Sequence, residues 1–134
     1  MGQYHRLVNL DKQEWVDAHE LGLGVKQYEH TGFEGSLSDA MYLLVMSSPA
    51  SGGGDFPLTD VSGRWCGDRV IVLGDYTQAD AIPGFPHADT LYEIVEARYN
   101  NISKSVREAL GEVFSLTYGT EMIGNIEFIT RSEL

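Results

Sequence analysis

The chain has one cysteine, Cys66, in 134 residues, and only nine Lys and Arg against twenty Asp and Glu. A lone cysteine cannot form an intramolecular disulfide, so we expect packing to stabilise the fold, in a reducing compartment such as the cytoplasm. The shortage of cations gives a formal charge of −11, which repels phosphate backbones. Direct binding of nucleic acid is therefore not expected, whereas a basic protein partner is compatible with this charge.

Long apolar runs are also missing. No window approaches the about 20 apolar residues that cross a bilayer. The N-terminus MGQYHRLVNL has no signal-peptide stretch, and Arg6 stands where N-myristoylation requires Ser or Thr. We expect no membrane segment and no lipid anchor.

The remaining composition is that of an ordinary globular protein, with 43% hydrophobic and 22% charged residues. The length fits one domain, residues 1–134. Strands and helices follow one another without regular strand–helix–strand alternation, which favours an α+β fold with a mainly antiparallel sheet and about three helices. We expect the helices to cover one face of that sheet.

Three strand regions are predicted from short runs of branched and aromatic residues. QYHRLVNL and Glu14 to Val16 form a first hairpin around a turn at Asp11. The segment SGRWCGDRVIVLGDY predicts a second hairpin, from Trp65 to Leu73, and its continuous apolar run is typical of a central strand buried on both faces. EMIGNIEFIT, residues 121–130, alternates as a strand does.

Three helices are predicted from capping residues and helical spacing. Ser36 caps a helix over residues 37–46, and Thr90 with Glu93 forms a capping-box signature for residues 91–99. Ser103 caps a helix in which apolar residues recur at Val106, Leu110, Val113 and Phe114. Two long connections, residues 17–35 and 47–62, are rich in Gly and Ser, and loops of this length often bind ligands.

Cys66 has two interpretations. Arg64 and Arg69 nearby can lower the pKa of a thiol, but no histidine base lies near in sequence. The alternative, a small residue packed beside Trp65, is favoured. Asp75 and Asp80 after the apolar run are compatible with a cation or polar-ligand site, although Asp after Gly is common in turns.

Metal and nucleotide motifs are incomplete. GLGVK at residues 22–26 lacks the third glycine of a nucleotide fingerprint and the Gly-Lys-Ser/Thr of a P-loop, so its glycines are assigned to turns. The histidines, His5, His19, His30 and His87, have no ligand spacing with one another or with Cys66. We expect neither a metal nor a cofactor.

Two segments together resemble a known group. MGQYHRLVNLDKQEWV with LGLGVKQYEH, and GRWCGDRVIVLGDY, are similar to small uncharacterised bacterial proteins that begin with Met-Gly-Gln-Tyr and share a Gly-Arg-Trp-x-Gly-Asp-Arg hairpin motif. The resemblance covers mainly the first half of the chain. That group has no assigned reaction, so the resemblance implies no catalytic residue.

Two functional hypotheses follow. The first is a non-enzymatic interaction protein that engages a basic macromolecule through carboxylates in its long connections: Glu29, Glu34, Asp55 and Asp60. The second is a small hydrolase or polar-ligand-binding enzyme whose site gathers Tyr4, His19, Lys26, Arg64 and Asp75. The enzyme requires these groups to converge in one pocket, whereas the binding protein does not.

Overall fold

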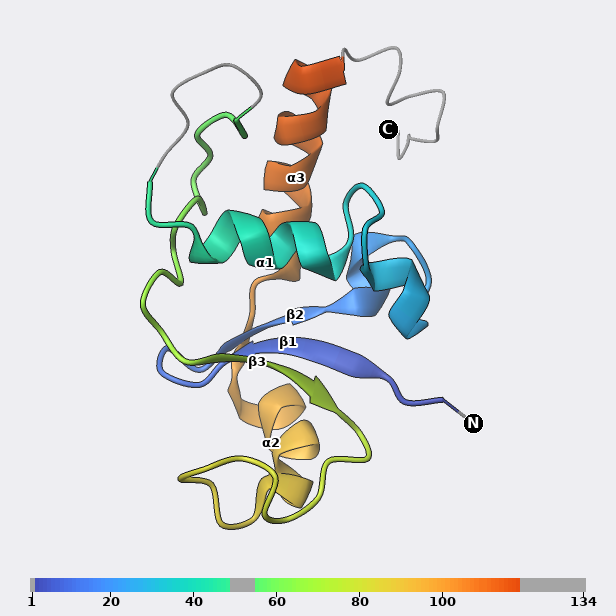
Figure 1. Ribbon diagram of the computed structural model, residues 1–134, viewed down its shortest axis with the longest axis vertical. Helices are drawn as coiled ribbons and strands as arrows, with labels where there is room; N and C mark the ends of the chain where they lie inside the picture. The colour runs from blue at the N-terminus through green and yellow to red at the C-terminus, as the bar shows by residue number, and fades with distance from the viewer. Residues whose placement is uncertain (1, 49–54, 119–134) are drawn as a thin grey trace.

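One four-stranded sheet lies at the centre of the molecule, with helices above and below it (Figure 1). The computed structural model describes residues 2–48 and 55–118. The strands are β1 (His5–Asn9), β2 (Glu14–Asp17), β3 (Val70–Gly74) and β4 (Asn100–Asn101), in the order β3-β1-β2-β4. β1 pairs antiparallel with both β2 and β3, and β4 pairs parallel with β2. The predicted α+β fold with a mainly antiparallel sheet is confirmed.

The first hairpin forms where it is predicted. Asn9 pairs with Glu14 across the end of β1 and β2. The Asn9 side-chain oxygen accepts the backbone N–H groups of Asp11 and Lys12 at 2.9 and 2.8 Å. This Asx-type turn reverses the chain, and Gln13 completes the turn with a positive φ of 57°. The register places every second residue of each strand on the same face.

The three predicted helices are present: α1 (Leu37–Val45), α2 (Leu91–Arg98) and α3 (Ser103–Tyr118). Three short 3₁₀ helices accompany them: η1 (Ala18–Leu21), η2 (Gln27–His30) and η3 (Ala88–Thr90). The caps predicted for α1 and α2 do not form, because neither Ser36 nor Thr90 accepts a backbone N–H of its helix through its side chain. The Ser36 hydroxyl bonds the hydroxyl of Ser38, and Asp39 accepts the N–H of Gly35. No helix in the described part of the chain is long and apolar enough to cross a membrane.

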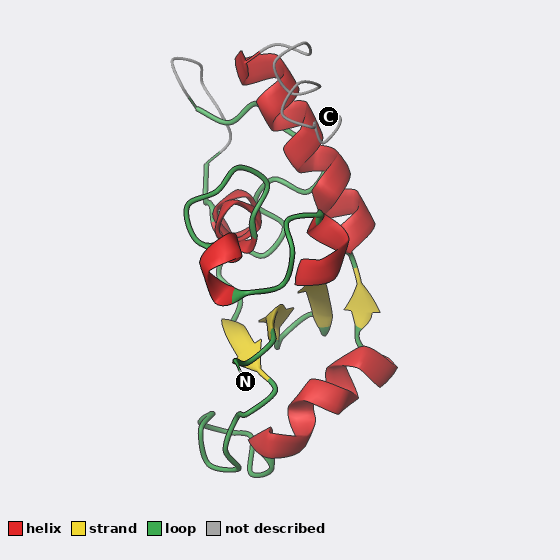
Figure 2. Cartoon of the chain, turned by 90° about the vertical axis from the view of Figure 1, so that its right-hand side faces the viewer, coloured by secondary structure: helices red, strands yellow, loops and turns green. Residues whose placement is uncertain are grey.

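The helices cover both faces of the sheet, so the expectation of one covered face is wrong. α1 and α3 pack on the face that carries Leu7 and Val16, and α2 packs on the face that carries Val8 and Trp15. Figure 2 shows these three layers from the side. Leu7 and Val8 are both fully buried, which requires cover on the two sides of β1. We call these the α1/α3 face and the α2 face.

The second predicted hairpin does not form. Residues 62–68 are a series of turns, and Gly63 and Gly67 have positive φ angles of 71° and 82°, which interrupt any extended strand. Trp65 instead docks against α1, where its backbone N–H donates to the carbonyl of Leu44 at 2.8 Å. Within the part of the chain that the structure describes, β3 pairs with β1 alone and is an edge strand, not a central one. Its Val72 side chain is 55% exposed.

The strand predicted over residues 121–130 lies outside the described residues. What the described part establishes is one core cluster on each face of a single sheet.

Candidate functional site

A pocket of about 250 Å³ opens on the α1/α3 face, between the sheet and the segment that leads into α1. Its floor comes from β1 and β3, and its walls come from η1, η2 and the first turns of α1. The apolar side chains that line it include Leu7, Val25, Leu37, Met41 and Val72. A cavity of this size accommodates one apolar side chain or a small organic group.

His30 supplies a polar wall of the pocket, and both of its ring nitrogens are used. Nε2 lies 2.8 Å from the carbonyl oxygen of Gly24, and Nδ1 lies 3.1 Å from the backbone nitrogen of Leu37. The carbonyl requires an Nε2–H donor and the amide requires an Nδ1 acceptor, which assigns the neutral Nε2–H tautomer. His30 therefore joins η2 to the start of α1, and its nitrogens are not available for proton transfer.

His5, at the start of β1, also lines the pocket. Its Nδ1 is buried and has no hydrogen-bond partner among the described residues. An unsatisfied buried polar atom costs about 1–3 kcal/mol.

Three of the five residues of the enzyme hypothesis gather near the start of β1. Tyr4 and Asp75 are joined by two bonds: the Tyr4 N–H donates to the Asp75 carboxylate at 3.0 Å, and the Asp75 N–H donates to the Tyr4 carbonyl at 3.1 Å. The Tyr4 and His19 rings are 6.1 Å apart between centroids. His19 Nδ1 lies 3.1 Å from the carboxylate of Asp17. This group is exposed and open to solvent.

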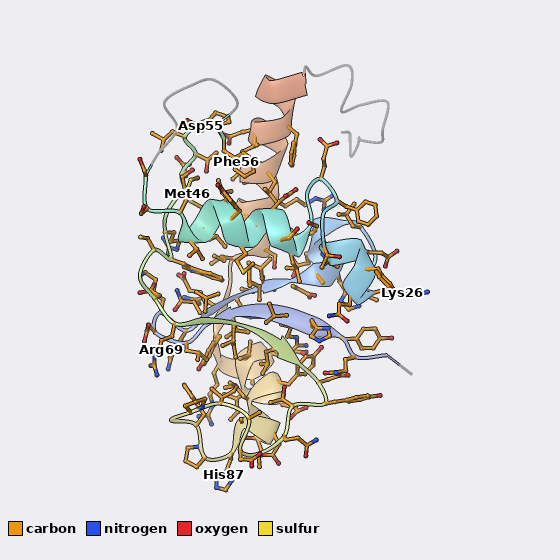
Figure 3. The ribbon with its side chains drawn as sticks, in the orientation of Figure 1. Lys26, Met46, Asp55, Phe56, Arg69 and His87 are labelled. Atoms are coloured by element: carbon orange, nitrogen blue, oxygen red, sulfur yellow. The ribbon has the colours of Figure 1, made fainter. Side chains whose placement is uncertain are left out.

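Lys26 lines the pocket and is exposed, on the outer side of the molecule (Figure 3). It directly precedes η2, and the carboxylate of Glu29 accepts its backbone N–H at 3.0 Å. The Glu29 backbone N–H in turn donates to the carbonyl of Lys26 at 2.9 Å, so two hydrogen bonds between these residues close the first turn of η2.

Arg64 lies at the other end of the sheet and does not join this group. Its Nε donates to the carboxylate of Glu14 at 3.0 Å, and Glu14 pairs with Asn9, four residues along β1 from His5. Four residues of strand span roughly 13 Å. The hydrogen bond from Arg64 is the main cause that lowers the pKa of Glu14, and the same bond raises the pKa of Arg64. The five proposed site residues therefore do not converge.

The carboxylates of the interaction hypothesis fall into two groups. Glu29 and Glu34 lie in the segment that leads into α1, on the pocket side. Asp55 and Asp60 are exposed in the segment beyond the other end of α1, and Figure 3 shows Asp55 across the molecule from Lys26. The charge of Glu34 contributes to a raised pKa of Asp39, after burial, which is the largest cause. The acidic surface near the pocket is therefore Glu29, Glu34 and Asp39.

Cys66 is exposed, which corrects the interpretation of a small side chain packed beside Trp65. The turns at residues 62–68 direct it outward while Trp65 is fully buried. Within the ranges that the structure describes, no three His, Cys, Asp or Glu side chains are grouped so as to hold a metal ion. His87, for example, lies at the α2 end of the molecule (Figure 3).

Exposed apolar side chains surround the pocket. Met41 and Val72, which line it, are 39% and 55% exposed, and Tyr28 and Phe33, in the segment that leads into α1, are 85% and 57% exposed. The sequence alone does not reveal the pocket, because its floor and walls come from five separate elements. One local signal was available: alternation along β1 puts His5 on the same face as the core residue Leu7.

Comparisons with protein-family models, curated proteins and solved structures found no match to this chain.

Proposed function

We propose that the protein is a non-enzymatic binding protein that engages a basic protein partner through the pocket and the acidic surface beside it. The observation that carries the proposal is the pocket itself, an apolar cavity with exposed Met41 and Val72 at its edge and with Glu29 and Glu34 close by. An apolar side chain flanked by cations is complementary to this arrangement.

The polar groups near the pocket have structural duties, which supports binding over catalysis. His30 bonds the start of α1 through Nδ1 and the carbonyl of Gly24 through Nε2, and the Glu29 carboxylate accepts the backbone N–H of Lys26. Asp75 accepts a backbone N–H of Tyr4. Catalysis by an acid and a base requires side chains that are free to exchange protons with a substrate.

The charge balance supports a basic partner and argues against nucleic acid. Arg6, Lys12, Arg64 and Arg69 are held in ion pairs within the chain. With only nine Lys and Arg against twenty Asp and Glu, the surface keeps a large excess of carboxylates. The single cysteine supports the cytoplasm as the compartment of this binding.

The test is affinity purification from the native host, followed by binding kinetics of the recovered partner at increasing salt. We expect a basic protein whose association rate falls as salt rises, because surface charges are screened beyond about 8 Å at physiological ionic strength. Two double variants locate the contact: Glu29→Gln with Glu34→Gln on the pocket side, and Asp55→Asn with Asp60→Asn on the far side.

Only the pocket-side pair is expected to weaken binding, by roughly three- to tenfold. The far-side pair removes the same formal charge and is the matched control. Equal effects of the two pairs would contradict a contact at the pocket, and a small molecule bound independently of salt as the sole partner would contradict the proposal as a whole.

A polar-ligand-binding enzyme is the second candidate, and the grouping of Tyr4, His19 and Asp75 favours it. Asp17 orients the His19 ring, as a carboxylate orients a general base. In that case His19→Ala or Lys26→Ala abolishes turnover while the fold stays intact, whereas the binding proposal predicts no turnover to lose. Screening of ester and amide substrates with wild-type protein and His19→Ala distinguishes them.

A further inference from the structure

Among residues 2–48 and 55–118, the edge of β3 that faces away from β1 is unpaired, and the backbone groups along it can be identified. In antiparallel pairing, residues alternate between pairs that exchange two hydrogen bonds and pairs that exchange none. The N–H of Leu10 donates to Arg69 at 2.8 Å, and the N–H of Asp75 donates to Tyr4 at 3.1 Å, which identifies these as bonded positions at the two ends of β3. The residues of β3 that exchange hydrogen bonds with β1 are therefore the odd-numbered ones, Ile71 and Leu73.

Val70 and Val72 take the other positions, opposite Asn9 and Leu7. Their N–H and C=O groups point away from β1, toward the edge of the sheet, and no partner for them is found within residues 2–48 and 55–118. At Gly74 the carbonyl is already used, since it accepts from the backbone and the hydroxyl of Thr77 at 3.2 and 2.7 Å. Val70 and Val72 thus present two N–H and two C=O groups along this edge.

Natural sheets protect such edges with charge, proline or a bulge. β3 reads VIVLG and contains none of these. Its outward residue Val72 is 55% exposed and also lines the pocket. Val72 therefore belongs both to the unpaired edge of the sheet and to the lining of the apolar pocket.

We propose that the partner adds an extended segment to the edge of β3 as a fifth strand and inserts one apolar side chain into the pocket. The proposal rests on the proposed function and specifies its geometry. Side chains of neighbouring strands at paired positions lie about 5 Å apart on the same face. A residue paired with Val72 on the α1/α3 face therefore reaches the pocket, where Leu37 and Met41 contact it.

The occupant is a basic segment rather than a second copy of this chain. Pairing of two β3 edges would bring together two molecules that each carry −11, which charge repulsion opposes. A segment that carries cations, by contrast, is attracted by the excess of carboxylates that gives this chain its charge of −11.

The experiment uses a synthetic seven-residue peptide of alternating lysine and leucine as the probe, with calorimetric titration into the full chain. Two matched peptides accompany it: one with N-methylated backbone amides, which keeps charge and side chains but cannot donate in a strand, and one with glutamate in place of lysine. We expect the lysine peptide to bind and each matched peptide to bind at least about tenfold more weakly.

Protein variants test the same edge. Val72→Pro removes an outward N–H that β1 does not use, so the sheet is retained, and Val72→Thr keeps that N–H with a similar shape. We expect proline, but not threonine, to abolish peptide binding. If Val72→Pro does not fold, the N-methylated peptide gives the answer with wild-type protein.

Equal binding of the methylated and unmethylated peptides would overturn strand addition, even if a basic partner is recovered from the host and the proposed function holds. Dimerisation of the free chain that Val72→Pro abolishes would overturn it in favour of a second copy. Loss of binding on methylation, together with a partner that binds independently of salt, would retain the edge and overturn the charge-based proposal of function.

Discussion

Replacement of Trp65 by alanine tests the inference that the turns at residues 62–68 are fastened to the core by one side chain. Trp65 is fully buried between α1 and α3, and its indole N–H donates to the carboxylate of Glu14 at 2.8 Å. Truncation of a buried tryptophan to alanine costs about 3–5 kcal/mol, which includes the cavity that it leaves. We expect Trp65→Ala to lose that much of a total stability that is about 5–15 kcal/mol for a domain.

Urea denaturation followed by circular dichroism measures this loss, because it does not rely on tryptophan fluorescence. Trp65→Phe separates packing from hydrogen bonding: it keeps most of the apolar contact and removes only the bond to a charged group, worth about 1.5–3 kcal/mol. Cys66→Ala is the control at the adjacent exposed position, expected within about 0.5 kcal/mol of wild type. A loss below about 1 kcal/mol for Trp65→Ala, or a larger loss for Cys66→Ala, would refute the reasoning.

Three further outcomes follow from the contacts. The pKa of Glu14 is lowered below its ordinary 4.5, mainly by the hydrogen bond from the Arg64 guanidinium. The ionised Glu14 therefore stabilises the fold above pH 4.5, and this contribution is lost as the pH falls through the lower pKa of the folded state. We expect the urea midpoint of Glu14→Gln to fall less between pH 7 and acid than that of wild type. Gly63→Ala destabilises more than Gly67→Ala in thermal unfolding, because both have positive φ but only at Gly63 does a new Cβ meet a backbone carbonyl, at 3.0 Å. Arg6→Lys is expected to lower the free energy of unfolding by roughly 1–3 kcal/mol in urea denaturation. The Arg6 guanidinium lies 3.7 Å from the centroid of the Tyr92 ring and donates to the backbone carbonyl of Tyr92, a geometry that an ammonium cannot reproduce. A loss no larger than that of an ordinary surface substitution would contradict this role.

The local elements could be predicted from the sequence, because their signals are local. The turn at Asp11, the helical spacing of α3 and the polar residues ahead of α1 and α2 each lie within a few residues of the element that they indicate, although neither Ser36 nor Thr90 makes the predicted side-chain cap. Strand neighbours are different. The run from Val70 to Leu73 has the same composition whether the strand is central or at an edge, and only its pairing with β1 decides between them.

The candidate site depends on the same non-local information. The contact between Tyr4 and Asp75 follows from the register of β1 against β3, and the separation of Arg64 from them follows from its bond to Glu14. No spacing in the sequence encodes either distance. His30 was considered only as a metal ligand, because its two hydrogen bonds to Gly24 and Leu37 exist only once η2 and α1 have packed.

The path of the chain between β3 and β4 makes the α2 face a replaceable part. Residues 75–99 leave the sheet at one edge strand and return at the other, so the layer that contains α2 comes from one continuous segment of the chain. Three interstrand spacings separate those edges, roughly 14 Å, a distance that about five extended residues span. A short segment in place of residues 75–99 would connect the remaining elements in the same order, but it would leave Val8, Trp15 and Leu73 without cover. A substitute layer therefore needs only to match that apolar surface, which gives evolution and engineering a place to insert new sequence without disturbing the pocket on the opposite side.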